Sequence, residues 1–135
     1  MSEQGKKVVL CVDDNNVVLE CLKPYLSSRG YVVLTASSGG RGLELFAVHP
    51  VDVVIVDGHM PGMDGHRVAL QIRRIGPHTP IIMFSGQEDV PGETLELVDA
   101  FVSKGRTDSL PSLARLIDGL TWRLAAETPN AIATL

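Results

Sequence analysis

The stretch Val51-Asp52-Val53-Val54-Ile55-Val56-Asp57 decides the fold. Its apolar residues are mostly β-branched and do not alternate with polar ones, which is typical of a strand covered on both faces. Strands of this kind occur in parallel sheets, and this one stops abruptly at an aspartate. A parallel sheet needs further strands of the same type, so the rest of the chain should contain them.

Four more short apolar runs do occur, and they alternate with amphipathic segments. The runs lie at 7–12, 31–36, 80–84 and 100–103. Helices are expected at 16–29, 40–48, 65–75, 93–97 and from 109 to about 127, because apolar residues recur there at helical spacing or helix-capping residues bound the segment. Strands that alternate with helices indicate right-handed βαβ units. The sequence therefore predicts an α/β fold, a doubly wound five-stranded parallel sheet with helices on both faces.

Composition and charge set the size of the protein and exclude several functions. The chain has 135 residues, 44% of them hydrophobic and 21% charged, so we expect one globular domain without an output module beside it. Its net charge of -4 argues against a broad nucleic-acid or acidic-membrane surface. No run of 18 apolar residues and no signal peptide occur, so we expect a cytoplasmic protein without membrane insertion. Cys11 and Cys21 are expected to be buried thiols.

Polar residues gather where the predicted strands end. Asp13 and Asp14 follow the first run, Asp57 follows the third, Ser85 the fourth, and Lys104 the fifth. In doubly wound sheets the functional site lies outside the carboxyl ends of the strands. Three clustered carboxylates repel one another unless a cation joins them, and an all-oxygen ligand set suits Mg²⁺. A lysine and a hydroxyl beside that metal would receive a phosphoryl group, with an aspartate as the nucleophile.

Four motifs at these positions make the chain resemble the receiver domain of two-component response regulators. They are Val-Asp-Asp at 12–14, Val-Asp-Gly-His-Met-Pro-Gly-Met-Asp-Gly at 56–65, Phe-Ser-Gly at 84–86, and Asp-Ala-Phe-Val-Ser-Lys at 99–104. The resemblance implies a flavodoxin-like three-layer sandwich with strand order 2-1-3-4-5. We expect the receiver domain to span 6–125 and the residues 126–135 to form a loose C-terminal tail.

The resemblance also implies the role of each site residue. Asp57 would accept phosphate from the phosphohistidine of a sensor histidine kinase or phosphotransfer protein. Mg²⁺ would be held by the carboxylates of Asp13, Asp14 and Asp57 and by the backbone carbonyl of His59. Ser85 and Lys104 would bind the phosphoryl oxygens. Ser85 and Phe101 would then switch a surface that contacts a downstream protein, without direct contact to nucleic acid. Such a protein is not an enzyme beyond its own phosphorylation and dephosphorylation.

Two departures from the family pattern keep other functions open. Gly105 follows Lys104 where the family has a proline joined by a cis peptide bond. A cis bond to a non-proline residue is costly, and the sequence leaves open whether this bond is cis or trans. The segment Val90-Pro91-Gly92 should shorten the fourth helix. One alternative is a docking module that signals without phosphorylation, and another is a phosphohydrolase with an aspartyl nucleophile.

Two side chains also keep alternatives open. His59 is either a solvated loop residue or lies over the phosphoryl group, and Trp122 either anchors a partner or is covered by its own tail.

Overall fold

The chain folds around a five-stranded parallel sheet. The computed structural model describes residues 5–86 and 90–133, with side-chain surroundings as far as Thr121. The sheet has the order β2-β1-β3-β4-β5, and every neighbouring pair is parallel. The predicted strand order and direction are therefore confirmed. The strands are β1 (Val8–Val12), β2 (Val32–Ala36), β3 (Val53–Val56), β4 (Ile81–Ser85) and β5 (Ala100–Ser103).

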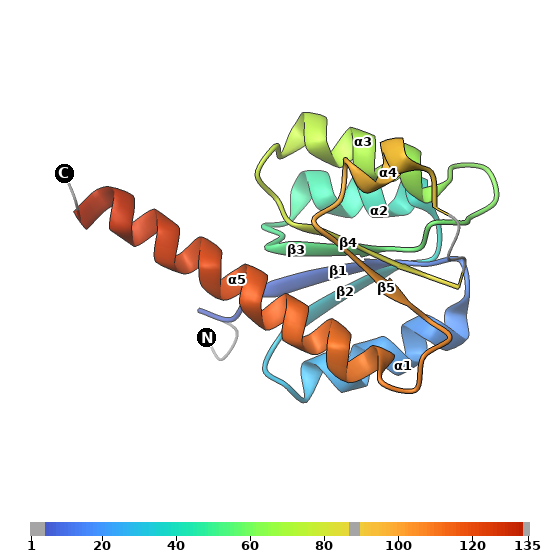
Figure 1. The fold of residues 1–135 in the computed structure, drawn as a ribbon, viewed down its shortest axis with the longest axis horizontal. Helices are drawn as coiled ribbons and strands as arrows, with labels where there is room; N and C mark the ends of the chain where they lie inside the picture. The colour runs from blue at the N-terminus through green and yellow to red at the C-terminus, as the bar shows by residue number, and fades with distance from the viewer. Residues whose placement is uncertain (1–4, 87–89, 134–135) are drawn as a thin grey trace.

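Helices cover both faces of this sheet, as predicted. Helices α1 and α5 lie on one face, and α2, α3 and α4 lie on the other (Figure 1). The helices are α1 (Asn16–Ser27), α2 (Gly39–Val48), α3 (Gly65–Ile75), α4 (Gly92–Leu95) and α5 (Ser109–Ala133). The three-layer sandwich expected from the sequence is confirmed.

The non-alternating apolar runs explain why both faces are covered. Successive residues of a strand point to opposite faces, so an all-apolar strand supplies two cores. Val9, Val53 and Ile82 pack with α1 and α5, whereas their neighbours Leu10, Val54 and Ile81 pack with α2 and α3. Each core is almost entirely aliphatic, in keeping with the low aromatic content.

Helix α4 is short, as the sequence indicated. It spans four residues, with Pro91 at its N-cap and no side-chain hydrogen bond capping it. It is tied to α3 by the His66 Nδ1 to Thr94 Oγ1 hydrogen bond of 2.9 Å. Helix α3 thus supports α4 through this polar contact.

Helix α5 differs from the sequence-based expectation. It was expected to end near Glu127 and to be followed by a loose tail, but it continues to Ala133 and extends away from the sheet in Figure 1. The residues Leu124-Ala125-Ala126-Glu127 are strong helix formers, which favours this continuation. The side chain of Trp122, for which two roles were left open, lies outside the described part.

The two cysteines have different surroundings. Cys11 on β1 is buried, and burial, followed by the nearby charge of Asp13, raises the pKa of its thiol to about 12. Cys21 is exposed, so the expectation that both thiols are buried is wrong. The buried stripe of α1 consists of Leu19, Leu22 and Leu26, and Cys21 falls outside it.

The long helix α5 raises the question of membrane insertion. Among the described residues, no helix is both long and apolar enough to cross a bilayer.

Candidate functional site

The strand order brings the predicted carboxylates together at one edge of the sheet. Asp13 follows β1 and Asp57 follows β3, and these strands are neighbours with Val12 opposite Val56. The Asp57 N–H donates to the carbonyl of Val12 at 2.9 Å, which fixes the two aspartates side by side. One carboxylate oxygen from each of Asp13, Asp14 and Asp57 lies within 4.8 Å of the others. Asp13 and Asp57 are buried, whereas Asp14 is exposed.

Lys104 supplies a positive charge to this cluster. Its Nζ lies 2.6 Å from Oδ2 of Asp13 and 3.4 Å from Oδ1 of Asp57. The Lys104 N–H donates to the carbonyl of Ser85 at 3.0 Å, so the end of β5 is attached to the end of β4. No described peptide bond is cis, so the bond between Lys104 and Gly105 is trans. One ammonium therefore faces two buried carboxylates.

Ser85 ends β4 on the other side of Asp57 from β1. It is 1% exposed and lies against Gly58. A Cβ built on Gly58 would come within 3.2 Å of the Ser85 hydroxyl, so glycine allows the chain after Asp57 to approach this side chain. A small pocket of about 90 Å³ opens beside them and is also lined by His66 and Thr94.

The loop after Asp57 places His59 by its backbone. The His59 N–H points at Oδ1 of Asp57 over 3.5 Å, and the His59 side chain is exposed. The exposed side chain of His59 agrees with the alternative of a solvated loop residue. Contact between His59 and a phosphoryl group stays a prediction. Met60 is buried in the core on the α2 and α3 side of the sheet, so its side chain anchors this loop.

The pKa of the Asp57 carboxyl is raised above its usual value. Burial is the largest cause, and the charge of Asp13 adds to it; the Lys104 ammonium and the His59 N–H act in the opposite direction. Because the effects that raise the pKa exceed those that lower it, the ionised form of Asp57 destabilises the folded state. Perturbed carboxyls that gather in a cleft are typical of functional sites.

This pKa direction gives a stability test in buffer without divalent cations. A carboxyl whose folded pKa is raised contributes stability below its unfolded pKa and loses it as pH rises through the folded pKa. We therefore expect Asp57→Asn to raise the free energy of unfolding at neutral pH, since it removes a buried charge whose pKa shift disfavours the folded state. The gain should shrink as pH falls toward 4, and urea unfolding at several pH values measures it. A variant less stable than the wild type at neutral pH would contradict this account.

Gly65 has a role that the sequence did not reveal. It begins α3, and a Cβ at this position would lie 2.3 Å from the carbonyl oxygen of Asp57 and 2.8 Å from Cα of Gly58. The first residue of α3 therefore packs directly against the backbone of Asp57. Asp64 caps the helix by accepting a hydrogen bond from the Arg67 N–H at 3.0 Å. The only sign of this close approach in the sequence was the glycine at position 65, which was interpreted only as the start of a helix.

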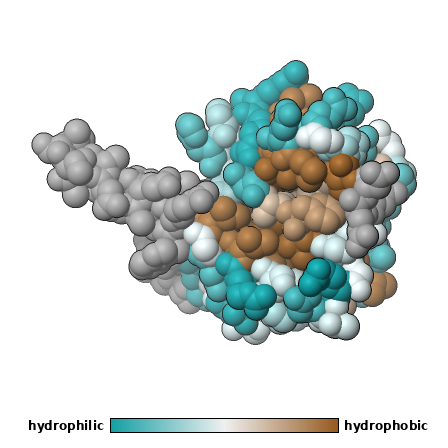
Figure 2. All heavy atoms as spheres, in the orientation of Figure 1, coloured by the Kyte–Doolittle hydropathy of each residue, from teal (hydrophilic) through white to brown (hydrophobic). Residues whose placement is uncertain are grey.

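Phe101 lies on the edge strand β5, opposite Met83 of β4. It is partly buried and packs against the core on the α2 and α3 side. It also lines a pocket of about 560 Å³ between β5 and the start of α5, together with Arg106, Arg115 and Leu116. Figure 2 shows apolar side chains gathered on this face, between α4 and α5. The aromatic switch assigned to Phe101 by resemblance stays a prediction.

Comparison with known proteins agrees with this geometry. The family model described as the response regulator receiver domain matches residues 9–105. A receiver domain protein from Clostridium thermocellum is 30% identical, with a TM-score of 0.80, covering 89% of this chain and 98% of that one. The response regulator TrrA from Thermotoga maritima, solved in complex with Mg²⁺-BeF, is 30% identical, with a TM-score of 0.76, covering 84% of this chain and 98% of that one.

Curated relatives are longer than this chain. The response regulator MprA from Mycolicibacterium vanbaalenii is 34% identical over 125 residues, which are 90% of this chain and 52% of that protein. The transcriptional regulatory protein GlrR from Escherichia coli is 35% identical over 99 residues, which are 71% of this chain and 22% of that protein. The chain therefore spans about half of one relative and less than a quarter of the other. Because relatives are named transcriptional regulators, the expectation that no nucleic acid is contacted gains no support.

Proposed function

Because the chain belongs to the response regulator receiver domain family, we propose that it is the phosphoacceptor of a two-component system, with Asp57 as the residue that is phosphorylated. The observation that carries this proposal is the buried Asp57 carboxylate held 3.4 Å from the Lys104 ammonium, with Asp13 and Asp14 beside it. The donor would be the phosphohistidine of a sensor histidine kinase or phosphotransfer protein. We assign residues 6–125 to the receiver and 126–135 to a C-terminal tail.

The residues present fit a divalent cation. The three aspartates offer oxygen atoms within 4.8 Å of one another, and Asp14 is exposed, which leaves room for the water ligands that Mg²⁺ keeps. Asp13, Asp14, Asp57 and the backbone carbonyl of His59 would hold the ion. When bound, Mg²⁺ neutralises charge on phosphoryl oxygens and positions them. The Mg²⁺-BeF complex of TrrA supports this assignment.

The reaction itself would be an in-line displacement at phosphorus. An Asp57 carboxylate oxygen forms the new O–P bond, the P–N bond of the phosphohistidine breaks, and the electron pair leaves with the imidazole. Lys104 sits where its ammonium can bind a phosphoryl oxygen, and Ser85 ends the strand next to the one that Asp57 follows. Burial of Asp57 keeps bulk water from the nucleophile and from the acyl phosphate that forms.

The protein phosphorylated on Asp57 would act through contacts with other proteins. Ser85 and Phe101 lie on the adjacent strands β4 and β5, so a change at the phosphorylated site can reach the face between α4 and α5. We propose that this face contacts a downstream protein. We propose that the protein works in the cytoplasm. Its catalysis would be limited to its own phosphorylation and dephosphorylation.

Incubation with Mg²⁺ and acetyl phosphate tests the function directly. Intact-mass measurement should show one phosphoryl group per chain, and peptide mapping should locate it on Asp57. The adduct should be lost in hydroxylamine, as expected for an acyl phosphate. Absence of the adduct in the presence of Mg²⁺ would overturn the proposal.

Binding of Mg²⁺ should also be visible without any phosphoryl donor. A ligand that binds only the folded state stabilises it by RT ln(1 + [L]/Kd), so Mg²⁺ at about ten times its Kd should add roughly 1.4 kcal/mol. We expect thermal unfolding to shift upward with Mg²⁺ in the wild type and not in Asp13→Asn. Asp64→Asn is the matched control, because Asp64 lies nearby but outside the cluster and asparagine also caps helices. An equal shift in wild type and Asp13→Asn would place the cation elsewhere.

A further inference from the structure

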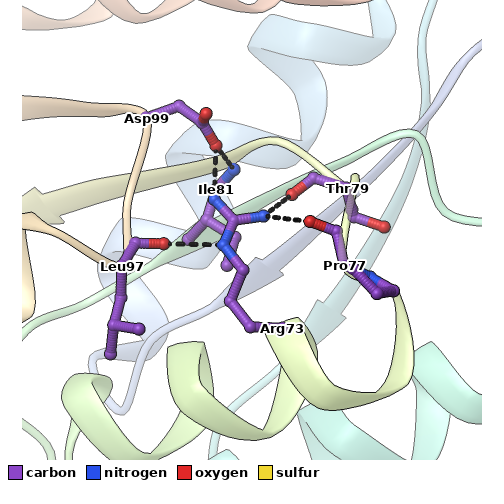
Figure 3. Close-up of polar contacts among 6 residues, drawn as sticks. All are labelled: Arg73, Pro77, Thr79, Ile81, Leu97 and Asp99. Carbon is purple, nitrogen blue, oxygen red and sulfur yellow. Dashed lines mark hydrogen bonds and ion pairs between the residues drawn. The ribbon is translucent and has the colours of Figure 1, made fainter.

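The guanidinium of Arg73 joins segments that are distant in sequence, at the end of the sheet opposite the candidate site. Arg73 lies in the last turn of α3, and Figure 3 shows its side chain reaching four acceptors. Nε donates to the carbonyl of Leu97 at 2.9 Å, and Nη2 donates to Oδ2 of Asp99 at 2.7 Å. Nη1 donates to the carbonyls of Thr79 and Pro77. A planar fork with several donors suits this arrangement, and lysine cannot reproduce it.

Asp99 connects Arg73 to the sheet. Its Oδ2 accepts a second hydrogen bond, from the N–H of Ile81 at 2.8 Å, and its own N–H donates to the carbonyl of Ile81 at 2.8 Å. Ile81 is the first residue of β4, and Asp99 directly precedes β5. Asp99 therefore pairs with the start of β4 through both its backbone and its side chain, and Arg73 holds the carboxylate in place.

The strand that follows Asp99 is short and lies at the edge of the sheet. Strand β5 has four residues, lies at the edge of the sheet and pairs only with β4. A slip of one residue would reverse the face to which each of its side chains points. Gly105 follows Lys104 at the far end, and glycine leaves the backbone less restricted than proline would. The contacts before the strand therefore add a constraint on its register, beside the burial of Val102 and the bond from the Lys104 N–H to the Ser85 carbonyl at its far end.

Lys104 depends on this register. It comes directly after β5, where its N–H bonds the Ser85 carbonyl, and its Nζ reaches Asp13 and Asp57. Lys104 comes five positions after Asp99 along extended chain, which is roughly 16 Å. We propose that Arg73 and Asp99 are positioning residues that fix the register of β5 and thereby place the Lys104 ammonium on Asp57. The effect on phosphoryl transfer rests on the proposed function, whereas the effect on the strand does not.

A double-mutant cycle tests the link to Lys104. We expect Asp99→Ala to lower the rate of Asp57 phosphorylation by acetyl phosphate about tenfold, a size typical of coupled positions. In a Lys104→Ala background the same change should have no further effect on the rate, because the ammonium that it misplaces is already absent. Equal fold-changes in both backgrounds would show that Asp99 acts only on general stability, and would overturn the proposal.

Variants at Arg73 separate geometry from charge. Arg73→Lys keeps the positive charge but loses the fork, so the rate should fall in the same direction as for Asp99→Ala. Arg74→Lys is the matched control, because Arg74 is the next residue of the same helix and is exposed. Its rate should equal that of the wild type. An Arg73→Lys variant with a wild-type rate would contradict the role given to the guanidinium.

Hydrogen exchange tests the same proposal without any phosphoryl donor. In Asp99→Ala the amide of Lys104 should exchange at least about tenfold faster, while amides of β1 and β3 keep their protection. Asp99→Asn retains an acceptor for the Ile81 N–H and should show a smaller increase, which also covers the case in which the alanine variant fails to fold. Unchanged exchange at Lys104 in the asparagine and alanine variants would overturn the proposal. If the wild type is not phosphorylated, the proposed function is refuted. Hydrogen exchange at Lys104 would still decide whether Arg73 and Asp99 fix the register of β5.

Discussion

Replacement of Asp57 with asparagine is expected to abolish phosphorylation, whether the donor is acetyl phosphate or a phosphohistidine protein. An amide is neutral and a poor nucleophile, whereas the ionised Asp57 carboxylate carries the electron pair that would attack phosphorus. The change is nearly isosteric, and the pKa direction of Asp57 indicates that it does not destabilise the folded state. Mass spectrometry after incubation with donor and Mg²⁺ should find no adduct in the variant and one adduct in the wild type.

Asp64→Asn is the matched control for this experiment. It makes the same chemical change in the loop that follows Asp57, and asparagine can retain the cap on α3. This control should be phosphorylated at the wild-type rate. An Asp57→Asn protein that still acquires a phosphoryl group would show that another residue is the acceptor.

The same variant separates phosphorylation from constitutive docking. If the chain signals only as a docking module, a partner should bind the wild type treated with donor and Asp57→Asn with equal affinity. If phosphorylation switches the face between α4 and α5, only the treated wild type should change its affinity. Calorimetry with a purified partner decides between these outcomes.

The sequence predicted the parts of the site that depend on strand ends. Four of the five apolar runs ended at a candidate site residue, and parallel strands place their carboxyl ends at one edge, so Asp13 and Asp57 were expected to meet. Neighbouring positions of β1 and β3 follow from the strand order, which the family resemblance supplied and the structure confirms. The expected short α4 followed from Pro91 and Gly92, whose backbone effects are local.

Other features depended on three-dimensional contacts that no local pattern encodes. The Arg73 contacts join residues 24 and 26 positions apart, and an arginine at the end of an amphipathic helix gives no sign of its partners. Cys21 lies in an apolar segment, but the helix turns it outward, so composition alone gave the wrong burial. Lys104 lies nearer to Asp13 than to Asp57, and this difference depends on the path of the chain after β5.

Replacement of Gly65 with alanine is expected to be among the most damaging single-methyl additions near the site. The added Cβ would lie 2.3 Å from the carbonyl oxygen of Asp57 and 2.8 Å from Cα of Gly58, and both are backbone atoms that cannot rotate away. Either α3 or the chain after β3 must shift, and overpacking of this kind costs about 3 kcal/mol. Urea unfolding should show a lower midpoint with an unchanged slope. Phosphorylation of Asp57 should also slow, because any shift of its backbone moves the carboxylate relative to Lys104.

Gly40→Ala is the matched control for this prediction. Gly40 also lies near the start of a helix, α2, but a Cβ there meets no atom within 4 Å. Alanine is a better helix former than glycine, so this variant should be as stable as the wild type or more stable by up to about 1 kcal/mol. The comparison isolates the close approach of α3 to Asp57 from the general effect of adding a methyl group to a helix. Equal stability of the two variants would mean that α3 can move without disturbing the site, and the positioning of Asp57 would then have to come from β1 and β3 alone.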